Sequence, residues 1–72
     1  MNVNDFVGFE VARCRLVDDM VEVVTDMDPA PGDFWTLYGR LKGNHEAVAL
    51  QDYATQADAL LARDSLTYQL TY

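Results

Sequence analysis

The chain has 72 residues, half of them apolar, and its 12 acidic and 5 basic residues give a formal net charge of −7. A chain of this length makes one small domain, residues 1–72, and its apolar residues are spread too evenly for a disordered acidic tail. The single cysteine excludes an internal disulfide, and no segment approaches the ~20 apolar residues of a membrane span, so we expect a cytoplasmic protein that does not bind membranes.

In the first segment, apolar residues alternate in two sets that are out of phase, first Val7, Phe9 and Val11 and then Cys14 and Leu16. The alternation favours a long strand over residues 5–17, with a β-bulge near residues 12–13 where the phase changes. A helix is the alternative, because Val7, Val11 and Cys14 also fall on one helical stripe. A turn over "VDDM" and a short second strand in "MVEVVTD" follow.

The middle of the chain predicts a loop and then a β-hairpin. Two prolines and a glycine in "DMDPAPGD", residues 26–33, exclude a helix or a central strand there. In "FWTLYGRL", residues 34–41, Trp35 and Leu37 alternate with Phe34 and Tyr38, as in a strand. The glycine-containing turn "KGN" joins this strand to a second alternating run, "HEAVALQDY".

The last segment begins with a helix. Thr55 is a suitable N-cap and Asp58 stands three residues later, where a carboxylate favours the first turn. We expect a helix over about residues 55–65, packed through Ala57, Leu60 and Leu61. The tail, residues 66–72, alternates strictly and favours a further extended segment, with a longer helix as the alternative.

These elements predict an α+β fold: an antiparallel β-meander of about four strands (β-β-β-β-α) with the helix on one sheet face. One helix covers only one face, so the other face stays open to solvent or a partner. Aromatic side chains are favoured at interfaces. The candidate partner contacts are therefore Phe34, Tyr38, Tyr68 and Tyr72.

The acidic residues are concentrated in the first half of the chain, where no basic residue stands between positions 18 and 33. Such a surface repels nucleic acid and anionic membranes and favours a cationic partner. The alternative is that the carboxylates serve only solubility. The candidate acidic patch comprises Asp18, Asp19, Glu22, Asp26, Asp28 and Asp33.

The reactive residues do not combine into a catalytic or metal site. His45 and Glu46 are neighbours on a predicted strand and point to opposite faces, so His45 is expected to be a solvated turn residue. Cys14 is flanked by two arginines, but on a strand both point away from its sulfur, and we expect a buried thiol. Ser65 has no histidine near it in sequence. We expect no cofactor, no metal and no nucleic-acid partner.

The sequence therefore favours a non-enzymatic module that binds another protein or itself, for example as a homodimer. An acidic mimic of nucleic acid, of the kind found in phages and plasmids, is the alternative, and it would inhibit a basic partner. Composition and spacing leave the identity of the partner open.

Overall fold

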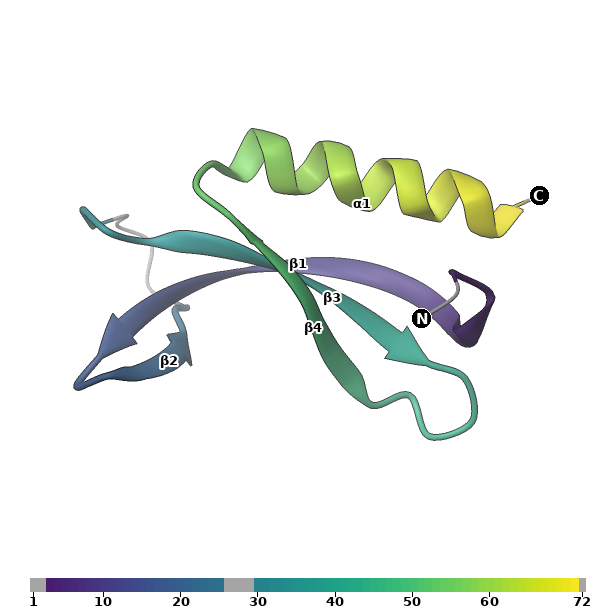
Figure 1. Cartoon of the computed structure of the whole chain (residues 1–72), viewed down its shortest axis with the longest axis horizontal. Coiled ribbons are helices and arrows are strands. Elements are labelled where there is room, and N and C mark those ends of the chain that lie inside the picture. Colours follow the sequence, from purple (N-terminus) through teal and green to yellow (C-terminus); the bar gives the residue numbers. More distant parts are fainter. Residues whose placement is uncertain (1–2, 26–29, 72) are drawn as a thin grey trace.

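Four antiparallel strands and one C-terminal helix make up the fold in the computed structural model, which describes residues 3–25 and 30–71 (Figure 1). The elements are a 3-10 helix η1 (Val3–Asp5), β1 (Phe6–Val17), β2 (Met20–Val23), β3 (Phe34–Leu41), β4 (Ala47–Tyr53) and α1 (Gln56–Thr71). The predicted α+β class, with four strands and then a helix packed on the sheet, is confirmed.

The strands lie side by side in the order β2-β1-β3-β4 (Figure 1). The long strand β1 pairs with β2 over residues 14–17 and with β3 over residues 6–14. The two halves of β1 therefore pair with two different strands. β2 becomes an edge strand, whereas a simple meander would place it between β1 and β3.

β1 keeps an unbroken register with β3 over residues 8–14, so the bulge predicted within this stretch is wrong. A register shift lies instead at Val7, between the pairs made by its two neighbours. The change of hydrophobic phase has another cause. Arg13 and Arg15 occupy positions on one side of β1, where both reach the carboxylate of Asp33. The ion pairs with Asp33 therefore explain why Arg13 and Arg15 stand where apolar residues would be expected, and no extra residue in the strand is needed.

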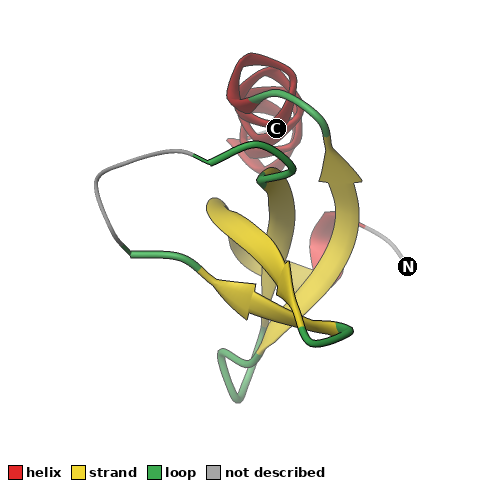
Figure 2. Ribbon diagram, turned by 90° about the vertical axis from the view of Figure 1, so that its left-hand side faces the viewer, coloured by secondary structure: helices red, strands yellow, loops and turns green. Residues whose placement is uncertain are grey.

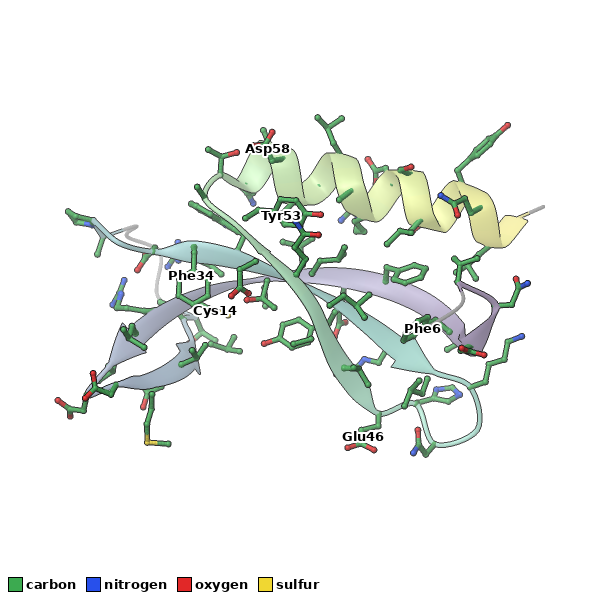
Figure 3. All side chains as sticks on the ribbon, viewed as in Figure 1. Phe6, Cys14, Phe34, Glu46, Tyr53 and Asp58 are labelled. Atoms are coloured by element: carbon green, nitrogen blue, oxygen red, sulfur yellow. The ribbon has the colours of Figure 1, made fainter. Side chains whose placement is uncertain are left out.

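The register also assigns side chains to the two faces of the sheet, because residues directly opposite on antiparallel strands share a face. Trp35 lies opposite Tyr53, which points from β4 toward α1 (Figure 3). Cys14 lies opposite Phe34 on the other face, which we call the open face. The open face comprises Glu10, Ala12, Cys14, Leu16, Val21, Val23, Phe34, Thr36, Tyr38, Arg40, Ala47, Ala49 and Asp52.

α1 starts as predicted but ends later. The hydroxyl of Thr55 accepts a hydrogen bond from the backbone N–H of Asp58 at 3.2 Å, which caps the first turn. The helix then continues to Thr71. The extended tail predicted for residues 66–72 is therefore wrong as far as residue 71, and Tyr72 lies outside the described residues.

Leu66 and Leu70 give the physical reason for the longer helix. They stand four residues apart, so a helix keeps both on one face. Both are half-buried, while Tyr68 between them is 66% exposed. A strand would place all three on the same side. The alternation in residues 66–72 is thus also compatible with a helix, because Leu66 and Leu70 are spaced by about one helical turn.

The packed face of α1 also differs from the predicted one. Ala57 and Leu61 are exposed, although Leu60 is half-buried. Ala59 is fully buried, and α1 packs on β1, β3 and β4 and reaches η1 (Figure 1). The stripe that faces the sheet is Ala59, Ala62, Leu66 and Leu70.

The small core between α1 and the sheet depends on a close approach of Phe6 to β3. Phe6 is 3% exposed, and its ring covers Gly39 so tightly that a Cβ at residue 39 would lie 2.5 Å from the ring Cδ1. Phe9 packs beside it with its ring tilted by 49° and the ring centroids 5.3 Å apart. Leu37, 2% exposed, completes this part of the core.

Candidate functional site

The open face holds a hollow of about 300 Å³ to which every strand of the sheet contributes. Its lining residues are Glu10, Ala12, Val23, Tyr38, Arg40 and Ala47. Val23 and Ala47 of the two opposite edge strands both line the hollow. The sheet that carries them is strongly twisted (Figure 2). α1 lies on the other side of the sheet and does not cover it (Figure 1).

The hollow has an apolar floor and a polar rim. The Tyr38 hydroxyl lies 3.9 Å from Sγ of Cys14, and burial, together with this thiol, raises the pKa of Tyr38 above its usual value. At the rim, Arg40 donates to the carboxylate of Glu10 at 2.8 Å and to the backbone carbonyl of His45 at 3.1 Å. Both partners of the Arg40–Glu10 pair are exposed, so this pair orients the rim and adds little stability.

Cys14 is the most deeply buried residue of the open face, with no exposed surface. It lies beside Phe34 (Figure 3), and its thiol is directed to the carbonyl of Ala12 at 3.7 Å. Arg13 and Arg15 point to the opposite side of the sheet, where they meet Asp33. The prediction of a buried thiol with both arginines directed away from it is confirmed.

Asp33 does not belong to an exposed acidic patch, although the sequence placed it there. Its side chain is 2% exposed, and Arg15 donates two hydrogen bonds to the carboxylate, at 2.7 and 3.1 Å. These bonds, with a third from the N–H of Ala30, lower the pKa of Asp33 from 3.8 to about 2. Arg13 approaches the same carboxylate at 3.5 Å. Asp33 therefore serves the fold, and its charge is compensated.

The rest of the predicted patch is divided by the structure. Asp18 and Asp19 form the turn between β1 and β2, both with positive φ, and Glu22 lies on β2. All three are exposed, and within the described part of the chain none of them makes an ion pair. Asp26 and Asp28 lie outside the described residues.

The four predicted aromatic contacts do not form one patch. Phe34 and Tyr38 lie on the open face and are half-buried, because the curled sheet partly covers them. Tyr68 lies on α1, on the other side of the sheet. Tyr72 lies outside the described residues.

Sequence reasoning missed the exposed apolar surface of the β1–β2 hairpin. Five large side chains there are exposed: Leu16 by 60%, Val17 by 37%, Met20 by 68%, Val21 by 58% and Val23 by 57%. Val23 lines the hollow, and Leu16 and Val21 extend the open face beyond it. The sequence does carry a signal for this surface, because two apolar residues stand on each side of the acidic turn. A hairpin at the edge of the sheet leaves such residues uncovered.

The remaining reactive groups stay apart. His45 lies exposed in the β3–β4 turn with positive φ, and Ser65 is exposed on α1. Among the described residues, no three His, Cys, Asp or Glu side chains are grouped so that they could hold a metal ion. The part of the chain that the structure describes contains no helix with the length and apolar character needed to cross a bilayer.

Comparison of the chain with protein-family models, with curated protein sequences and with solved structures found no match.

Proposed function

We propose that this protein is a non-enzymatic cytoplasmic module that binds a protein partner, or a second copy of itself, on the open face of its sheet. The observation that carries the proposal is the hollow of about 300 Å³, lined from all four strands and continuous with the exposed apolar side chains of the β1–β2 hairpin. A free thiol as the only cysteine supports a reducing compartment.

A macromolecular partner fits this face better than a small ligand. The hollow lies at the lower end of the roughly 300–1,000 Å³ range of small-molecule sites. Its apolar surface continues outward to Leu16 and Val21, which a small ligand in the hollow would leave in water. A partner that inserts one apolar side chain into the hollow and covers the hairpin would bury both, as interface anchors do.

Site-specific photocrosslinking in the native host tests this proposal. A photoreactive phenylalanine analogue in place of exposed Ala47, at the rim of the hollow, should yield a discrete covalent adduct with one partner or with a second copy of the chain. The matched control carries the analogue in place of Leu61, which is 69% exposed on α1. Equal adduct patterns from the two positions, or none from position 47, would contradict the proposal.

Self-association is the version of the proposal with the simplest test. Sedimentation equilibrium over a concentration series should show a dimer, and a strict monomer at high micromolar concentration removes this version. The net charge of −7 per chain opposes dimerisation through like-charge repulsion, which salt would weaken.

An acidic mimic of nucleic acid is the second candidate function. Asp18, Asp19 and Glu22 favour it, because they are exposed and have no ion-pair partner within the described residues. Binding of this kind is dominated by charge, so affinity for a basic partner should fall steeply with salt. An affinity that stays constant between low and high salt would exclude the mimic and leave the apolar interface.

A further inference from the structure

β2 is an edge strand whose outer side is free within the described part of the chain. It follows β1 through a two-residue turn, Asp18–Asp19, with φ of 50° and 66°, the left-handed pair of a tight type I′ hairpin. All four residues of β2 are exposed. The hairpin therefore bonds β2 to β1 on one side, and within the described residues its other side is unpaired.

The hydrogen-bond phase of the hairpin shows which backbone groups are free. The N–H of Val24 donates to the carbonyl of Arg13 at 2.8 Å, so residue 24 bonds inward to β1. In an antiparallel pair this inward bonding alternates, so Met20 and Glu22 also bond inward. The N–H and C=O groups of Val21 and Val23 then point outward, and they are the groups that an added strand would engage.

β2 has only part of the protection that edge strands usually carry. Such strands are kept short or carry charged residues, lysine above all, or proline or a bulge, because free backbone groups invite pairing with other chains. Of these features β2 has its length of four residues and Glu22. β2 contains Met20, Val21, Glu22 and Val23, and its register with β1 is unbroken. The opposite edge, β4, has a register shift between Leu37 and Tyr38 of its partner strand. Of the two edge strands, β2 is the one that has an unbroken register and exposes every residue.

Charge selects the occupant of this edge. Asp18 and Asp19 stand at one end of β2 and Glu22 stands on it, and none of the three has an ion-pair partner within the described residues. A second copy of the chain would bring the same carboxylates and another net charge of −7. A segment that carries lysine or arginine would compensate them.

We propose that the outer edge of β2 binds an extended segment of a partner protein in which apolar residues alternate with lysine or arginine, and that this segment pairs as a fifth strand. The inference rests on the proposed function and names the chemistry of the partner. The apolar residues of the segment continue the open face beside Val21 and Val23. Its cations lie on the opposite side, beside Glu22, and at the end near Asp18 and Asp19. Pairing of this kind takes affinity from main-chain hydrogen bonds and selectivity from alternate side chains.

The probe is a short fluorescein-labelled peptide in which lysine and valine alternate. Two peptides serve as controls, one with glutamate in place of lysine and one with the same composition but its valines in a single block. Fluorescence anisotropy should show binding of the alternating lysine peptide at least tenfold tighter than of either control. Bound peptide should also slow hydrogen exchange of the Val21 and Val23 amides but not of the Glu22 amide, which already bonds to β1.

Two variants of one residue test the pairing itself. Val21→Pro removes an outward N–H that β1 does not use, and proline is tolerated at such positions of an edge strand. Val21→Thr keeps both the N–H and the branched shape. We expect Val21→Pro to weaken binding at least tenfold and Val21→Thr to stay within twofold of the original protein. Circular dichroism checks that both are folded, and the exchange measurement on the unmodified chain does not depend on either variant.

Four outcomes would overturn the inference. Equal binding of the block and alternating peptides, or unchanged binding by Val21→Pro, would mean charge adhesion without strand pairing. Equal binding of the glutamate peptide would remove the charge argument. A dimer of the unmodified chain that Val21→Pro abolishes would make a second copy the occupant. In each case adducts from position 47 would still support the proposed function. Loss of those adducts, with the peptide results as expected, would confine binding to the edge of β2 and refute the part of the proposed function that places the partner in the hollow.

Discussion

Replacement of Gly39 by alanine should destabilise the protein because of the ring of Phe6. The added Cβ would lie 2.5, 2.6 and 3.1 Å from three ring carbons, whereas carbon atoms prefer about 3.5–4.0 Å. The ring would have to retreat by about 1 Å, and its site is only 3% exposed. Overpacking of this kind costs about 1–3 kcal/mol, offset by about 0.4–1 kcal/mol from the less flexible unfolded chain.

Gly8→Ala is the matched control. A Cβ at residue 8 meets nothing within 4 Å, so this change should be neutral or stabilise by up to about 1 kcal/mol. Urea unfolding, monitored by the fluorescence of Trp35, would measure the stability of both variants. The gain from the less flexible unfolded chain is common to both variants, so the overpacking cost of about 1–3 kcal/mol remains. If the free energy of unfolding falls by about 1 kcal/mol per M of urea, as is typical of a small domain, Gly39→Ala should lower the midpoint by about 1–3 M relative to Gly8→Ala.

A double-mutant cycle tests the assigned cause. In a Phe6→Leu background the flexible side chain can move aside, so the cost of Gly39→Ala should fall below about 0.5 kcal/mol. An equal cost of Gly39→Ala in both backgrounds, or equal stability of the Gly8 and Gly39 variants, would refute the close contact as the source of the effect.

Three further predictions concern the loss of stability at low pH, the length of α1 and the thiol of Cys14. The pKa of Asp33 is lowered from 3.8 to about 2 in the fold, so its stabilising contribution is complete above about pH 5 and is lost as the pH falls through 2. Asp33→Asn should flatten the dependence of stability on pH in this window, whereas Asp64→Asn, at an exposed ion pair, should not. If α1 continues past residue 65, Ser65→Gly should be about 1 kcal/mol less stable than Ser65→Ala by urea unfolding, whereas an extended tail predicts no such difference. Cys14, with no exposed surface, should react with a thiol reagent only as fast as the domain opens, so labelling faster than hydrogen exchange of the core amides would contradict its burial.

The face of the sheet on which a side chain lies was predicted correctly where neighbours along the chain control the geometry. Alternation placed Phe34 and Tyr38 on the face opposite Trp35, and the same rule separated Cys14 from its two arginines. The prediction failed for Asp33, because its partner Arg15 stands 18 residues away on β1 and no pattern of neighbouring residues indicates that ion pair. It also failed for Tyr68, which follows the helix to the far side of the sheet.

Local signals were sufficient for the β3–β4 hairpin, the turn at Asp18–Asp19 between β1 and β2, and the capped start of α1. Each depends on a few adjacent residues, such as the hydroxyl of Thr55 or the alternation in β3, and backbone sterics and short hydrogen bonds decide these conformations wherever the segment lies. The order of the strands, the length of α1 and the exposure of the β1–β2 hairpin required the folded molecule. They depend on which distant apolar surfaces cover one another, and a helical spacing such as that of Leu66 and Leu70 becomes decisive only when a sheet lies beside it.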